Sequence, residues 1–187
     1  DAEANLQALL GAEVGQLSVG LVSTAKYFMP RLLAKFSQAH PGVEVQFTVG
    51  NRETLLQKLQ DNAIDLAVMG RIPVEIDAHA EPMASHPYVL IGPADHPLRA
   101  ARRFDLQELR HETFLLREEG SGSRRVAEEM FKNHLFTPAR TISMGSNETI
   151  KQAVMAGMGV NLLSLHTLPL ELKTGEVSLP DVTDTPI

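Results

Sequence analysis

The residues of this chain best suited to binding chemistry stand in short polar turns, each of which follows an apolar stretch. Basic side chains outnumber acidic ones in these turns, although the whole chain of 187 residues has a net charge of −6. The turns cover residues 23–26, 50–53, 70–71, 117–125 and 145–148, with Lys26, Arg52, Arg71, Arg117, Arg124 and Arg125 against Glu53, Glu118, Glu119 and Glu148. A local excess of positive charge in an acidic chain indicates a site for a small anionic ligand.

Hydroxyl side chains in the same turns can donate hydrogen bonds to such a ligand. Ser23, Thr24 and Ser146 stand just before helix-like segments, where free backbone N–H groups and the helix dipole favour an anion. These three residues could equally be helix caps and nothing more. Arg71 follows a strand-like stretch directly. It is a better candidate for the fixed charge than the arginine pair at 124–125, which a solvated helix face would also explain.

The patterns that mark common catalytic and metal sites are absent from the sequence. The chain has no cysteine, and its 7 histidines are scattered without the helical spacing of a metal site. No Gly-x-Ser-x-Gly nucleophile elbow is present, and Gly120–Ser123 lacks the Gly-Lys-Ser/Thr ending of a phosphate loop. The sequence therefore predicts a binding protein with no enzymatic activity, metal or cofactor.

The elements that must position the polar turns alternate between strand and helix. Apolar residues alternate over residues 17–21 and 43–49, and recur at helical spacing after each polar turn. The same order recurs in the second half of the chain, at Phe114–Leu116 and Thr141–Met144. A proline-rich stretch that begins at residue 81 separates the two halves. Such a repeat predicts parallel α/β sheets, which bind ligands beyond the carboxyl ends of their strands. We expect two similar halves whose turns line the cleft between them.

Local signals also predict where individual helices begin and end. Asp105–Glu108 has the spacing of a capping box, with aspartate in the place of serine or threonine. Ser23 or Thr24 is expected to cap the first helix. Gly157 is expected to end the last long helix in the left-handed conformation.

The overall composition excludes several classes of partner. The net charge of −6 argues against nucleic-acid binding by this segment, because contacts to phosphate need clustered positive charge. No apolar run approaches the roughly 18 residues of a membrane helix. The start of the chain carries no secretory signal pattern, and the lack of cysteine suits a reducing cytoplasm.

The segments described above also carry a resemblance to a known family. They resemble the effector-binding domain of LysR-type transcriptional regulators in Leu17–Pro30, Ile64–Val68, Ser146–Glu148 and Ala156–Val160. The likeness covers nearly the whole chain. Within the family, the segments that look like the regulators of Calvin-cycle carbon-fixation genes are Met69–Arg71, Arg117–Arg124 and Asn147–Gln152.

The resemblance implies a type 2 periplasmic-binding-protein-like fold, in which two Rossmann-like subdomains hold a small metabolite in the cleft between them. Subdomain I would comprise residues 16–82 and 167–187, and subdomain II residues 83–166. Residues 1–15 would end a linker helix from a missing N-terminal winged helix-turn-helix, and the chain would be truncated at both ends. The family's effector-binding positions fall on Ser23, Thr24, Asn51, Arg71, Gly122, Ser123, Ser146 and Asn147.

We therefore expect the effector-sensing domain of a cytoplasmic bacterial transcription regulator. The basic turns and the carbon-fixation likeness favour a sugar bisphosphate or phosphoglycolate as effector. NADPH ranks lower, because the turns offer no aromatic face and no dinucleotide fingerprint. We expect a homodimer of this domain, a homotetramer of the full-length protein, DNA contact only through the missing domain, and no membrane partner. The alternative is an extracytoplasmic solute-binding protein of a transporter, which shares the fold.

Overall fold

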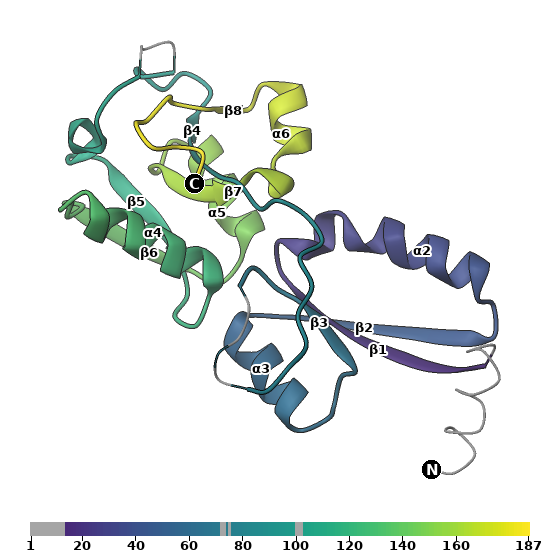
Figure 1. Ribbon diagram of the computed structural model, residues 1–187. Helices are drawn as coiled ribbons and strands as arrows, with labels where there is room; N and C mark the ends of the chain where they lie inside the picture. The colour runs from purple at the N-terminus through teal and green to yellow at the C-terminus, as the bar shows by residue number, and fades with distance from the viewer. Residues whose placement is uncertain (1–13, 72–73, 75, 100–102) are drawn as a thin grey trace. The chain divides into compact units, whose positions relative to one another are not determined.

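A computed structural model describes residues 14–71, 74, 76–99 and 103–187. The chain divides into two compact units, with the boundary between Pro82 and Met83 (Figure 1). The expected linker helix at residues 1–15 lies outside the described residues except at its end, where Gly15 is already the first residue of a strand.

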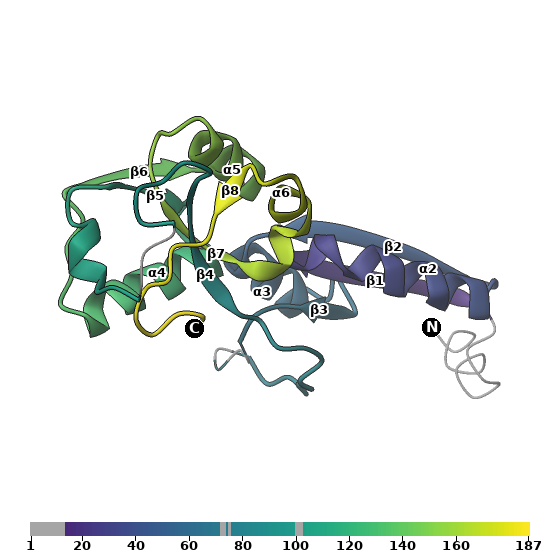
Figure 2. The same ribbon diagram turned by 90° about the horizontal axis from the view of Figure 1, so that it is seen from above.

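The first unit is a parallel sheet of strand order β2-β1-β3 with two helices. Its elements are β1 (Gly15–Val22), the 3-10 turn η1 (Ala25–Tyr27), α2 (Met29–Ala39), β2 (Val43–Gly50), α3 (Arg52–Gln60) and β3 (Leu66–Val68). Alternation along β1 buries Val19 and Leu21 in one cluster with Met29 of α2, whereas Gly20 on the other face approaches Leu55 of α3. The two helices therefore cover opposite faces of the sheet, and α2 runs along β1 and β2 (Figure 2).

The second unit contains the remaining strands in a mixed arrangement. Its elements are β4 (Tyr88–Pro93), η2 (Leu106–Leu109), β5 (Thr113–Arg117), α4 (Gly122–Asn133), β6 (Arg140–Met144), α5 (Asn147–Met155), β7 (Asn161–Ser164), η3 (Leu165–Thr167), α6 (Pro169–Thr174) and β8 (Val177–Ser178). The strands pair in the orders β7-β4-β8 and β5-β6, and a parallel bridge between Phe114 and Val160 joins the two groups.

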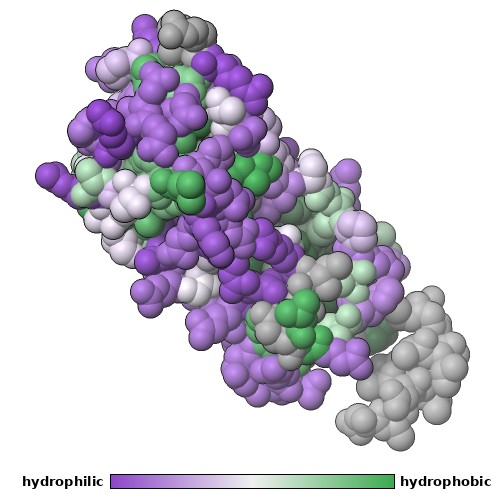
Figure 3. All heavy atoms as spheres, turned by 60° about the vertical axis from the view of Figure 1, so that its left-hand side comes forward, coloured by the Kyte–Doolittle hydropathy of each residue, from purple (hydrophilic) through white to green (hydrophobic). Residues whose placement is uncertain are grey.

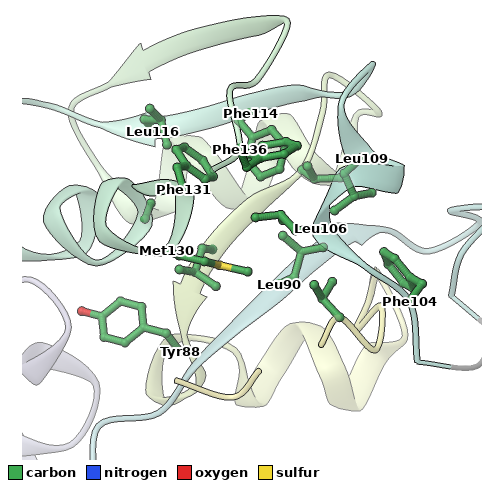
Figure 4. Close-up of a cluster of buried hydrophobic side chains, with 14 residues drawn as sticks. Tyr88, Leu90, Phe104, Leu106, Leu109, Phe114, Leu116, Met130, Phe131 and Phe136 are labelled. Atoms are coloured by element: carbon green, nitrogen blue, oxygen red, sulfur yellow. The ribbon is translucent and has the colours of Figure 1, made fainter. Parts of the chain in front are cut away.

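The core of the second unit lies on both faces of β5. Phe114 and Leu116 belong to a buried cluster with Met130 and Phe131 of α4 (Figure 4). Leu115, between them in the sequence, belongs to a second cluster with Ile150 of α5. A strand that is buried on both faces has a continuous apolar run instead of an alternating one. The strand predicted at residues 114–116 is confirmed.

The expectation of parallel sheets throughout is wrong for β4, which is antiparallel to both β7 and β8. This strand also accounts for the position of residues 167–187, which we expected in subdomain I and which belong to the second unit. β8 pairs with β4, and Ile187 exchanges two backbone hydrogen bonds with Tyr88, at 3.1 and 2.9 Å. The unpaired backbone groups along β4 need partners, and the end of the chain supplies them.

Two of the three predicted helix boundaries are confirmed. Asp105 accepts a hydrogen bond from the backbone N–H of Gln107 at 2.8 Å in a complete capping box, although the element it opens is the short 3-10 helix η2. Gly157 follows α5 with a φ of 77°. The capping role of Ser23 or Thr24 is wrong, because a 3-10 turn intervenes and α2 begins only at Met29, with a proline in its first turn.

Candidate functional site

The carboxyl ends of β1, β2 and β3 share one edge of the first unit, because the three strands run parallel. Ser23 and Thr24 follow β1, Asn51 follows β2, and Arg71 comes shortly after β3. The topology therefore gathers at one edge the four effector-binding candidates of this unit. Thr24 is buried, Ser23 and Asn51 are half-buried, and Arg71 is exposed.

Asn51 and Arg52 shape this edge. The Oδ1 atom of Asn51 accepts a hydrogen bond from the backbone N–H of Thr54 at 2.8 Å, so Asn51 is the N-cap of α3. The buried guanidinium of Arg52 donates to the backbone carbonyl of Arg71 at 2.8 Å. Arg52 thus ties the segment after β3 to the start of α3 and holds the main chain of Arg71 in place. The sequence shows Arg52 only as a basic residue of the turn and gives no sign of this positioning role.

The second unit has a corresponding polar edge. β5 and β6 are parallel, so Arg117 at the end of β5 lies near Gly145, Ser146 and Asn147, which follow β6. Gly122, the first residue of α4, and Ser123 follow the turn after β5. The predicted candidates of this unit therefore stand at the starts of two helices, next to Arg117, which was counted in the basic excess of the turns but not among the effector-binding positions.

Arg117 is the best-connected polar residue of this edge. Its side chain is only 5% exposed, and its Nη1 atom donates to the Oδ1 atom of Asn147. The Nε and Nη2 atoms of the same guanidinium donate to the two carboxylate oxygens of Glu118, at 2.8 and 2.9 Å. Asn147 is fully buried, so Arg117 orients an amide that we had expected to contact the effector directly. An arginine directly after an apolar strand was the available sequence signal for this role.

Tyr88 is a second residue that the sequence analysis missed. Its ring is buried at the start of β4, and its hydroxyl lies 3.3 Å from the Oγ atom of Ser123 in α4. The ring of His86 lies 4.8 Å from that of Tyr88 and 5.8 Å from that of His166. Burial, and to a lesser extent the neighbouring His166, lower the pKa of His86 below its ordinary value of 6.5. His86 is therefore neutral at physiological pH and adds no positive charge to this edge.

Ser146 caps α5, as the simpler of its two interpretations predicted. Its Oγ atom accepts a hydrogen bond from the backbone N–H of Thr149 at 3.1 Å and lies 2.9 Å from the Thr149 hydroxyl. The cap satisfies one of the N–H groups in the first turn of α5.

The cap has a measurable consequence for stability. Ser146→Ala should lower the free energy of unfolding by about 1 kcal/mol, because it removes the cap. Ser146→Asp should preserve stability, since aspartate caps equally well. Urea unfolding of the two variants measures this difference, and an Ala variant as stable as the wild type would show that the cap contributes nothing.

Within the described part of the chain, no group of three metal-ligating side chains comes together. No helix there is both long enough and apolar enough to cross a membrane.

Comparison with known proteins identifies the family. The family model of the LysR substrate binding domain matches residues 11–187. The transcriptional regulator CfxR of Cupriavidus necator is 66% identical over 187 residues, which are 100% of this chain and 59% of that protein. The regulator CbbR of Rhodospirillum rubrum is 49% identical over 187 residues, which are 100% of this chain and 62% of that protein. The chain thus spans about three fifths of the length of these relatives.

A solved structure agrees with the fold. The CcmR regulatory domain of Synechocystis PCC6803, determined in complex with 2-PG, is 39% identical to this chain and aligns with a TM-score of 0.87. The alignment covers 92% of this chain and 83% of that domain. The expected type 2 periplasmic-binding-protein-like fold of two subdomains is confirmed. The relatives are named as transcriptional regulators, a non-enzymatic family, in agreement with the lack of catalytic patterns. The chain belongs to the family of LysR substrate-binding domains.

Proposed function

We propose that this effector-binding domain senses a small phosphorylated metabolite of carbon fixation, such as 2-phosphoglycolate or a sugar bisphosphate. The observation that carries the proposal is the bound 2-PG (2-phosphoglycolate) of the CcmR regulatory domain, whose fold this chain shares. Relatives in Allochromatium vinosum and Acidithiobacillus ferrooxidans, 42% and 40% identical to this chain, are named RuBisCO operon transcriptional regulators, which supports a role in regulating carbon-fixation genes. The alternative of a transporter's solute-binding protein is not favoured, since the relatives are regulators.

The chemistry of the two edges supports an anionic effector. The first unit offers Arg71, whose backbone carbonyl accepts a hydrogen bond from Arg52 at the start of α3. The second unit offers the buried guanidinium of Arg117 and the start of α5. Backbone N–H groups at helix starts and planar guanidinium groups both bind phosphate and carboxylate oxygens well. NADPH remains the second candidate and has no comparable observation in its favour.

Calorimetric titration of the chain tests the proposal. We expect saturable binding of 2-phosphoglycolate or ribulose bisphosphate and no binding of a neutral sugar. Tight binding of a neutral or cationic compound, with none of the phosphorylated ones, would contradict an anionic effector.

We propose that, in the whole protein, the effector acts by shifting a two-state equilibrium that an N-terminal winged helix-turn-helix reports to DNA. A ligand shifts such an equilibrium only by its difference in affinity for the two states. The DNA contact would belong to the part of the relatives that this chain does not span.

We also propose that the domain forms a homodimer, and that the whole protein forms a homotetramer. Twofold pairing is the commonest closed assembly. The first unit exposes apolar side chains on α2 and on its edge strand β2, with Leu32 45%, Phe47 55% and Val49 46% exposed. On the face shown in Figure 3, by contrast, hydrophilic residues predominate and hydrophobic ones form small separate patches.

Sedimentation of the chain at tens of micromolar should show a dimer. Phe47→Lys should shift the equilibrium towards monomer, because a charge replaces an exposed apolar side chain on an edge strand. Leu135→Lys, at a position 91% exposed in the second unit, is the matched control and should leave the dimer intact. A wild-type chain that sediments only as monomer would contradict the proposal.

A further inference from the structure

Arg117 and Glu118 form a bidentate ion pair at the end of β5. The two residues are adjacent in the chain, yet the carboxylate of Glu118 makes two parallel contacts with the guanidinium, Nε to Oε2 at 2.8 Å and Nη2 to Oε1 at 2.9 Å. This side-by-side arrangement is the one in which arginine recognises a carboxylate or a phosphate of a ligand. It forms because β5 ends at Arg117 and the chain turns there.

The two partners differ in their access to water. The side chain of Arg117 is 5% exposed, whereas that of Glu118 is 32% exposed. The carboxylate therefore covers the guanidinium and is itself reached by solvent. The opposite corner of the guanidinium is held by Asn147, and the backbone carbonyl of Gly145 lies 3.5 Å from Nη2. If Glu118 swings into water, another oxyanion can take its place at the Nε and Nη2 atoms of Arg117, which Asn147 still holds.

The cost of this exchange is low. The carboxylate of Glu118, which is 32% exposed, already contacts water and regains further hydration when it leaves, which lowers the cost of the exchange. A buried guanidinium left without an anion is costly, so an incoming oxyanion is favoured at that place. The start of α5 lies next to Arg117 through Asn147 and favours negative charge further.

We propose that the carboxylate of Glu118 occupies the place on Arg117 where the anionic group of the effector binds. The effector binds by displacing this carboxylate from Arg117. The inference rests on the proposed function and adds the group that the effector must displace. Glu118 then sets both the affinity and the selectivity of the site, because only a ligand that presents two anionic oxygens can replace a carboxylate.

The test compares two variants that remove the same charge from adjacent positions. Glu118→Gln removes the anion that competes for Arg117. Glu119→Gln is the matched control, because the Glu119 side chain is 91% exposed and approaches only Arg124, at 3.9 Å. Calorimetric titration with 2-phosphoglycolate and with a neutral sugar is carried out on both variants and on the wild type, and thermal unfolding verifies that each variant is folded.

We expect Glu118→Gln to bind 2-phosphoglycolate about two- to fivefold more tightly than the wild type, because an ion pair with one partner in contact with water contributes up to about 1 kcal/mol. Glu119→Gln should change the affinity by less than about twofold, the effect of one screened surface charge. Equal or weaker binding by Glu118→Gln, or an equal gain in both variants, would overturn the inference while leaving the proposed function intact. A wild type that binds no phosphorylated metabolite would overturn the proposed function and the inference with it.

Discussion

Replacing Arg71 with alanine is expected to weaken the binding of a phosphorylated effector by about ten- to a hundredfold, because one charge-assisted hydrogen bond contributes roughly 1.5–3 kcal/mol. Arg71 is exposed at the edge where the strands of the first unit end. The contact that positions it, from Arg52, goes to its backbone carbonyl and survives the substitution. The variant should therefore lose the guanidinium without losing the local fold.

Two further variants sharpen this measurement. Arg71→Lys should recover only part of the affinity, since an ammonium group has no planar pair of donors. Arg31→Ala removes the same charge from an exposed position on α2 of the same unit and should leave the affinity unchanged. Calorimetric titration with 2-phosphoglycolate distinguishes these cases. Wild-type affinity in Arg71→Ala would remove Arg71 from the site.

Replacing Lys151 with methionine is expected to lower the free energy of unfolding by about 3–5 kcal/mol, because it leaves a buried carboxylate without its counter-charge. The Nζ atom of Lys151 lies 2.6 Å from the Oε1 atom of Glu171, and the two side chains are 8% and 10% exposed. Lys151 also donates to the backbone carbonyl of Thr167 at 3.0 Å. Through these contacts α5 is tied to η3 and α6.

The matched variants separate the ion pair from the volume of the side chain. Adding Glu171→Leu to Lys151→Met should recover most of the lost stability, since an apolar pair needs no counter-charge. Lys173→Met, at an exposed position on α6, should change stability by less than about 0.5 kcal/mol. Urea unfolding followed by circular dichroism measures all three. A loss below about 1 kcal/mol in Lys151→Met would show that water reaches Glu171 and that the pair is not a buried one.

The choice between a cap and a ligand contact illustrates what the sequence could predict about the site. Ser146 caps α5 as expected, but Ser23 and Thr24, which are of similar residue type, do not cap α2, which begins only at Met29. The difference lies in the 3-10 turn at Ala25–Tyr27. A cap depends on the backbone conformation that follows it, and in this segment packing of Ala25 and Met29 in the core competes with simple helix initiation.

The sequence by itself determined the strands β1, β2, β5 and β6 and the helix ends at Asp105 and Gly157, because each of these depends on residues within one strand or one helical turn. It also determined that polar residues would follow the parallel strands. Only the tertiary structure decided that residues 167–187 join the second unit along β4, and that Arg117 holds Asn147, 30 residues further along the chain. The contact between Arg117 and Asn147 can form only after β5 and β6 have paired, because pairing brings the carboxyl ends of the two strands together. The periodicity of apolar residues predicts each helix or strand from its own residues. The partner of a buried charge depends on which distant segments pack around it and exclude water.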